Sequence, residues 1–164
     1  MPLERWQAGP VVGIPPLLQP VAHALLQAGD DVAPVRTLTA AQLWATPGGV
    51  AAIGWHLLHL AGSTDRLLTY ARGEPLTPTQ RSRLELERTL PDPRPTAASL
   101  VAGWDGTVAA ALAQLGETAE ADLLLPREVG RARLPTTVLG LLFHTAEHAS
   151  RHAGQVVTTM KLVR

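Results

Sequence analysis

The sequence contains no cysteine among its 164 residues. Disulfide bonds, thiolate nucleophiles and cysteine metal ligands are therefore excluded, and the reducing cytoplasm is the compartment we expect. Any metal ion would need His, Asp or Glu side chains as its protein ligands.

An excess of charge is also missing, because 14 basic residues balance 14 acidic ones. Nucleic acid is therefore not an expected partner. The longest apolar stretch, residues 48–62, is shorter than the roughly 20 residues that span a bilayer, and His56 and His59 interrupt it. Residues 1–6 lack the basic and apolar pattern of a secretory signal, so we expect neither membrane insertion nor export.

Aromatic residues and isoleucine are scarce, with six aromatic side chains and two isoleucines. Leucine and alanine are abundant, with 27 and 25 residues respectively. This balance favours helices over a β-rich core. The length fits one domain, so we predict a single all-α domain over residues 1–164.

Apolar residues recur at helical spacing in four long segments. A proline pair opens the first segment, and Gly29 and Gly116 are plausible ends of the first and third. Thr39 can cap a short additional helix between the first two. The four predicted helices cover approximately residues 16–29, 49–72, 96–116 and 136–160.

Two long connections separate these helices. Residues 73–95 contain a capping pattern at Thr77 to Gln80 and a mixed-charge run from Arg81 to Arg88, which predicts a short solvated helix. Residues 117–135 are expected to be irregular. Connections of this length permit parallel as well as antiparallel neighbours, so the spacing leaves the order of a four-helix bundle open.

Five of the six histidines fall on two predicted helices. His144, His148 and His152 lie four residues apart on one face of the last helix, and His56 and His59 lie three apart on the second. Side chains four apart are about 6 Å apart at Cβ, so either adjacent pair of the last helix can bind one ion, but all three cannot. The second helix would supply the third ligand.

Three protein ligands would leave one coordination position for water or a substrate. The ion would then act as a Lewis acid that ionises bound water or a bound thiol. The pairing of His148 with His152 in an apolar helix favours a metal, because neutral imidazoles on a core face need compensating partners. A structural role is favoured for His23 and, by a smaller margin, for His56 and His144.

Two segments resemble the DinB/YfiT-like superfamily of metalloenzymes. Residues 59–67, HLAGSTDRL, are similar to the family's second-helix segment, and residues 148–156, HASRHAGQV, are similar to its last-helix signature of two histidines followed by Gly-Gln. The resemblance implies that His59, His148 and His152 are the metal ligands. Arg151 stands where many members carry an additional histidine.

The resemblance also implies a four-helix bundle in up-down-down-up order, a divalent ion such as zinc or nickel, and a homodimer. Characterised relatives include transferases that join a low-molecular-weight thiol such as bacillithiol to electrophiles, and a mycothiol-dependent isomerase. It therefore implies a metal-dependent thiol S-transferase, whose partners are a small thiol and an electrophile. Trp55, Trp104 and Arg66 are candidate pocket residues, although core packing of the tryptophans and solvent exposure of the arginine are favoured.

Three alternatives stay open. Residues 144–148 spell H-x-x-E-H, the inverted zinc-peptidase motif, which would require His144 for metal binding and not His152. A different metal-dependent hydrolase is the second alternative. The third is a non-catalytic dimeric helical scaffold that the metal only stabilises. The residues themselves assign no catalytic side chain.

Overall fold

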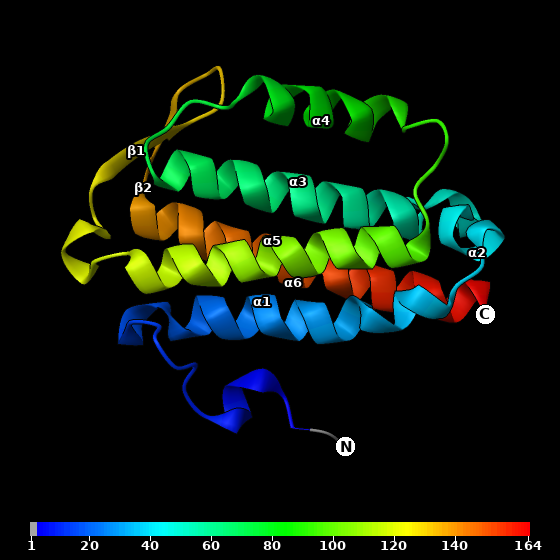
Figure 1. Ribbon diagram of the computed structural model, residues 1–164, viewed down its shortest axis with the longest axis horizontal. Coiled ribbons are helices and arrows are strands. Elements are labelled where there is room, and N and C mark those ends of the chain that lie inside the picture. The colour runs from blue at the N-terminus through cyan, green and yellow to red at the C-terminus, as the bar shows by residue number, and fades with distance from the viewer. Residues whose placement is uncertain (1–2) are drawn as a thin grey trace.

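A computed structural model describes residues 3–164, in which six α-helices and one two-stranded sheet are found (Figure 1). Met1 and Pro2, the start of the segment that lacks a signal pattern, lie outside the described residues. The mainly helical prediction is confirmed. The helices are α1 (Gln19–Val32), α2 (Ala40–Trp44), α3 (Ile53–Ala71), α4 (Pro78–Thr89), α5 (Ala97–Glu117) and α6 (Val138–Val163).

The four long helices α1, α3, α5 and α6 lie side by side. Helix α6 packs against both α1 and α3, and α5 packs against the same two helices (Figure 1). Helices α1 and α6 run in one direction, and α3 and α5 run in the other (Figure 1). Helix α4 carries the chain back along the outside of α3, so that α5 starts at the same end as α3 (Figure 1).

Leucine side chains and Trp104 fill the space between these helices. Trp104 on α5 is completely buried, which agrees with the expected core packing of this tryptophan. The apolar spacing of each helix therefore places one face in a common core. Completely buried leucines come from all four long helices and include Leu25, Leu57, Leu60, Leu115 and Leu142.

Capping threonines correctly mark the starts of two helices, α4 and α5. The Thr77 hydroxyl accepts from Gln80 N and the Thr96 hydroxyl accepts from Ser99 N, as their capping patterns indicate. Gly29, in contrast, does not end α1, which continues to Val32. Burial of Val32 in the core outweighs the weak helix-breaking tendency of one glycine.

A β-hairpin replaces part of the connection that was expected to be irregular. Strands β1 (Pro126–Val129) and β2 (Leu134–Thr137) pair antiparallel. Thr137 caps α6, which begins two residues later than expected. Each strand has four residues and contains a proline. No alternating apolar pattern marks them, so periodicity gave no signal of strands here.

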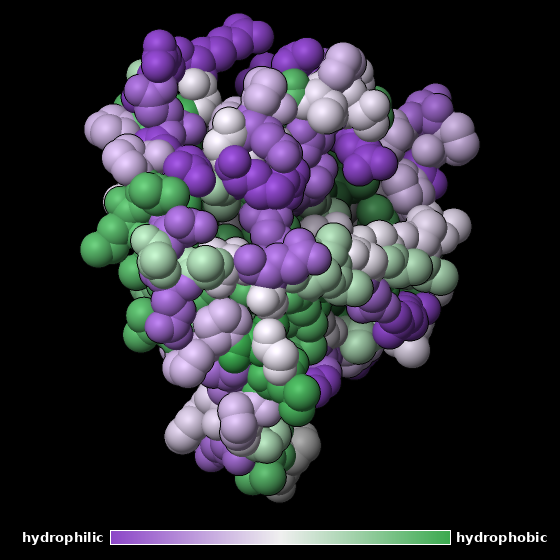
Figure 2. All heavy atoms as spheres, turned by 60° about the vertical axis from the view of Figure 1, so that its left-hand side comes forward, coloured by the Kyte–Doolittle hydropathy of each residue, from purple (hydrophilic) through white to green (hydrophobic). Residues whose placement is uncertain are grey.

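Short 3-10 segments complete the structure. They comprise Arg5–Ala8, Pro16–Leu18, Ala33–Thr37, Pro47–Gly49 and Glu120–Asp122. Figure 2 shows hydrophilic residues gathered over the upper part of the surface, at the height of α4 and the hairpin in Figure 1. Among residues 3–164, no helix combines the length and the apolar character needed to cross a membrane.

Candidate metal centre

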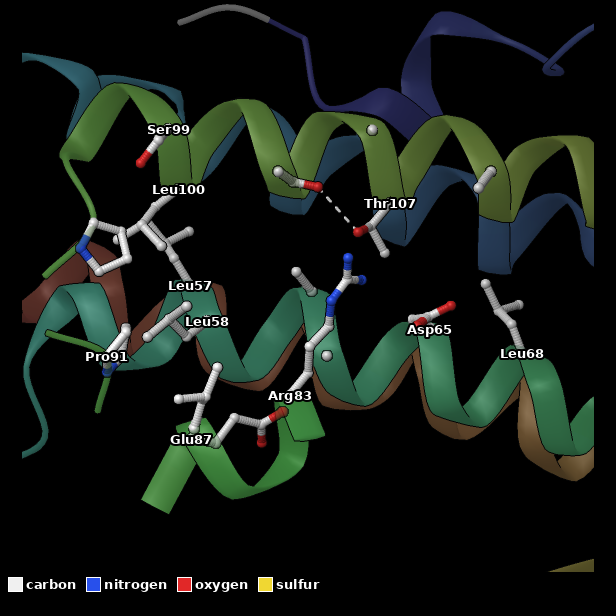
Figure 3. A pocket seen from close by; sticks show the side chains of 17 residues that line it. Leu57, Leu58, Asp65, Leu68, Arg83, Glu87, Pro91, Ser99, Leu100 and Thr107 are labelled. Atoms are coloured by element: carbon white, nitrogen blue, oxygen red, sulfur yellow. Dashed lines mark hydrogen bonds between the residues drawn. The ribbon is translucent and has the colours of Figure 1, made fainter. Parts of the chain in front are cut away.

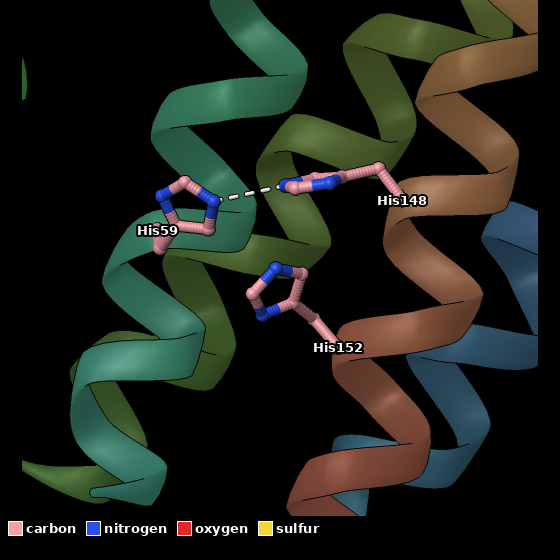
Figure 4. A group of neighbouring side chains, drawn as sticks. All are labelled: His59, His148 and His152. Carbon is pink, nitrogen blue, oxygen red and sulfur yellow. Dashed lines mark hydrogen bonds between the residues drawn. The ribbon is translucent and has the colours of Figure 1, made fainter. Parts of the chain in front are cut away.

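Three histidines meet between α3 and α6. His59 projects from α3 toward His148 and His152 of α6, and the three rings point toward one another (Figure 4). One ligand atom from each residue lies within 4.8 Å of the others, and His59 Nε2 is 2.9 Å from His148 Nε2. Two nitrogens bound to one tetrahedral zinc ion lie roughly 3.4 Å apart. These three side chains could therefore hold one metal ion.

His148 and His152 are held in the neutral form that a metal requires. Burial, followed by repulsion from neighbouring histidines, lowers the pKa of His148 to about 4 and that of His152 to about 3. A histidine must be deprotonated to bind a metal ion, so at neutral pH these side chains can bind without first losing a proton. A set of three imidazole nitrogens suits zinc, nickel, copper or iron.

Glu87 of α4 orients His59 from the side opposite the cluster. His59 Nδ1 lies 2.8 Å from Glu87 Oε2, and an ionised carboxylate can only accept, so Nδ1 is the donor. In the neutral ring that a metal ion binds, the lone pair of His59 is then on Nε2, which faces His148. Burial raises the pKa of Glu87, but hydrogen bonds from His59 and Arg66 outweigh it and leave this pKa below its usual value.

Arg66 completes this arrangement with a buried ion pair. Its Nη1 and Nη2 donate to Glu87 Oε1 and Oε2 at 2.5 and 3.1 Å. Arg66 is 8% exposed, so the expected solvent exposure of this arginine is wrong. The sequence around Arg66 did not indicate a partner for this side chain, because Glu87 lies 21 residues further along the chain.

Gly62 makes room for the ion pair. A Cβ atom at this position would overlap Glu87 Oε1 and lie 2.8 Å from Arg66 Nη1. A side chain of any size would therefore push the carboxylate away from α3. The glycine in the HLAGSTDRL segment, about one helical turn after His59, is thus needed because it lets the Glu87 carboxylate approach α3.

His56 contacts His152, one of the three clustered histidines. Its Nδ1 lies 2.8 Å from His152 Nδ1, and both side chains are buried. When His152 Nδ1 donates its proton to His56 Nδ1, the lone pair of His152 is on Nε2, where it can bind a metal ion. Burial, with a smaller contribution from His59, lowers the pKa of His56 to about 4, so this neighbour is also neutral at pH 7. The role favoured for His56 was structural, and it contacts the cluster directly.

Trp55 forms a flat wall beside His59. The two rings are stacked, with centroids 4.9 Å apart and planes inclined by 5°. The indole nitrogen of Trp55 donates to the carbonyl oxygen of Glu87 at 2.8 Å, which ties α3 to the end of α4. Trp55 is thus half-buried at the site and is not part of the central core.

The other two histidines lie outside the three-residue group. His144 is exposed, and its Nδ1 lies 3.1 Å from Glu147 of the same helix. His23 Nε2 contacts the carbonyl oxygen of Gly9 at 2.9 Å. The H-x-x-E-H spelling therefore places its glutamate beside its own first histidine, on the exposed side of α6.

Two cavities flank the site. The first, with a volume of about 550 Å³, lies between α3, α4 and α5, and Figure 3 shows Glu87 at its edge with Leu57 and Leu100 on its walls. The second, of about 700 Å³, is lined by both His56 and His152. We call it the α3–α6 cavity, because residues of these helices and of the segment before α3 enclose it. A molecule in the α3–α6 cavity would lie next to the histidine cluster.

Glu87 is the site residue that sequence reasoning missed. The segment Arg81 to Arg88 was expected to be solvated, yet Gln80 and Glu87 are each 7% exposed. These two residues lie seven apart, two helical turns, and so share one face of α4. That spacing was the available signal, but the charged residues between them concealed it.

Comparison with known protein families supports the family resemblance found in residues 59–67 and 148–156. No curated protein matches the chain. The sequence model of the DinB superfamily matches residues 16–156, a range that contains the helices α1 and α3 and all three clustered histidines. Because this match covers most of the chain, the protein belongs to the DinB superfamily.

Proposed function

We propose that this protein is a metal-dependent transferase that joins a low-molecular-weight thiol, such as bacillithiol, to an electrophilic substrate. In this proposal His59, His148 and His152 bind one zinc or nickel ion. The observation that carries it is a group of three imidazoles within 4.8 Å, without a fourth His, Asp or Glu in the group among residues 3–164. Three ligands leave a position for the thiol.

A divalent ion supplies one chemical property here, since it lowers the pKa of a thiol that occupies the remaining position. The side chains set the conditions for this. Neutral imidazoles leave the positive charge of the ion undiminished, and Glu87 and Arg66 hold His59 in one orientation. In the overall reaction the sulfur forms a bond to the electrophilic carbon, the leaving group departs with its electron pair, and the thiol proton passes to solvent.

The arrangement of the long helices belongs to the same proposal. We infer a four-helix bundle in up-down-down-up order, supported by the side-by-side packing of α1, α3, α5 and α6 and by the crossover through α4. We also propose that the protein is a homodimer and resides in the cytoplasm. Light scattering of the purified protein tests the dimer.

An assay of thioether formation tests the activity. The purified protein, loaded with zinc or nickel, is mixed with bacillithiol or cysteine and with 1-chloro-2,4-dinitrobenzene, and product absorbance is followed. We expect turnover that a chelator abolishes and added metal restores. A metal-loaded protein that gains thermal stability from the ion but transfers none of these thiols would instead be the non-catalytic scaffold.

A further inference from the structure

The α3–α6 cavity has a buried floor and an open, apolar rim. His56, His152 and Thr159 form the floor, with exposed fractions of 5%, 9% and 5%. Val50 and Leu162 stand at the rim with 46% and 64% of their surface exposed. A volume of about 700 Å³ falls within the range of small-molecule sites. The cavity thus offers apolar contact at its mouth and ends at His152, one of the three clustered histidines.

The charge of this cavity is balanced. Arg151 is its one charged lining residue, and Glu147, one helical turn earlier, pairs with that guanidinium. The remaining polar lining groups besides the histidines and the Trp55 indole are the Gln155 amide and the hydroxyls of Thr158 and Thr159. With the vacant metal position taken by the thiol, as proposed above, the lining offers an ionised ligand no unpaired opposite charge in return for its hydration, which is costly. An uncharged ligand avoids this cost.

We propose that the α3–α6 cavity binds the electrophile, and that this substrate is an uncharged, largely apolar molecule of aromatic size. The inference rests on the proposed function, because it assigns the second substrate of that reaction. The flat indole of Trp55 and the side chains of Val50 and Leu162 contact the apolar body of the ligand. Neutral groups such as Gln155 donate to an oxygen on it, and His152 brings its reacting carbon beside the metal position.

Gly154 allows the cavity to be filled without damage to the fold. It lines the cavity, and a Cβ atom at this position would meet no heavy atom within 4 Å. Gly154→Leu therefore places a side chain in free space and replaces glycine by a better helix former. Gly106→Leu is the matched control, since Gly106 is an exposed glycine of α5 whose added Cβ would also meet nothing within 4 Å.

The experiment measures binding and needs no turnover. Zinc-loaded wild-type protein and both variants, with saturating cysteine to occupy the vacant metal position, are titrated calorimetrically with 1,3-dinitrobenzene, an unreactive neutral probe, and with 4-nitrobenzoate, its anionic counterpart. We expect wild-type protein and Gly106→Leu to bind dinitrobenzene equally and Gly154→Leu to bind it at least tenfold more weakly. Nitrobenzoate is expected to bind at least tenfold more weakly than dinitrobenzene to the wild type. Zinc content should be unaffected, and thermal stability should not fall, in both variants.

Three results would overturn the inference. Equal binding of dinitrobenzene by Gly154→Leu and wild-type protein would place the site elsewhere. Tighter binding of nitrobenzoate would mean that Arg151 selects an anion. Concentration-dependent dimerisation that Gly154→Leu abolishes, without dinitrobenzene binding, would mean that the rim contacts a second copy of the chain. Failure of thiol transfer alone leaves these binding results intact, so the two proposals fail separately.

Discussion

Replacing Glu87 by glutamine should weaken the hydrogen bonds that hold the His59 ring in its orientation. The carboxylate accepts three hydrogen bonds, one from His59 and two from Arg66, at 2.8, 2.5 and 3.1 Å. A glutamine has one accepting oxygen, so its amide nitrogen must face at least one of these donors. Glu85→Gln is the control, because Glu85 lies on the same helix and forms a surface pair with Arg88.

The expected loss of metal affinity for Glu87→Gln is about 10- to 100-fold, the usual effect of removing the carboxylate behind a ligating histidine. This corresponds to about 1.4–2.7 kcal/mol. The free energy of unfolding of the metal-free variant should also fall by about 3 kcal/mol, because Arg66 stays buried without its partner. Competition with a chromophoric zinc chelator measures the first quantity, and urea denaturation measures the second. Zinc affinity within threefold of the Glu85→Gln control would refute the assigned role of Glu87.

Three further predictions concern the ligands, the ion pair and pH. His152→Ala should lose stoichiometric zinc, and His144→Ala should keep it; metal analysis with the reverse outcome would favour the H-x-x-E-H alternative. Gly62→Ala should lower the free energy of unfolding by about 1–3 kcal/mol through overpacking, whereas Gly106→Ala should not lower it; equal urea midpoints would contradict the crowding at Gly62. The metal-free protein should lose stability as the pH falls from 6.5 toward about 3, because three imidazoles with folded-state pKa values of about 3 to 4 take up protons first in the unfolded chain. Urea denaturation at pH 7 and pH 5 measures this, and unchanged stability would count against neutral buried histidines.

The helices and the histidine cluster were accessible from sequence for different reasons. Apolar periodicity is repeated over many residues of each long helix, so its signal survives local exceptions such as Gly29. Three- and four-residue spacings place side chains on one helix face, and this identified the histidines of α3 and of α6 as separate groups. That His59 meets His148 and His152 depends on how two helices pack, and the family resemblance supplied it.

The remaining features depend on contacts between distant segments. The burial of Arg66 follows from its ion pair with Glu87, which lies on another helix. The sequence did not indicate the β-hairpin, because its strands have only four residues each, one beginning with Pro126 and the other containing Pro135. His56 was expected to be structural because a three-ligand site does not need it, and its contact with His152 follows from the approach of α3 to α6.

The stacking of Trp55 on His59 gives the chain an intrinsic optical reporter. Of its four tryptophans, Trp55 has its ring centroid 4.9 Å from that of His59. A paramagnetic ion such as Ni²⁺ or Cu²⁺ bound to His59 would quench the emission of this indole, whereas closed-shell Zn²⁺ would leave most of it. Occupancy of the centre, and exchange of one metal for another, can therefore be followed by fluorescence in the unlabelled protein.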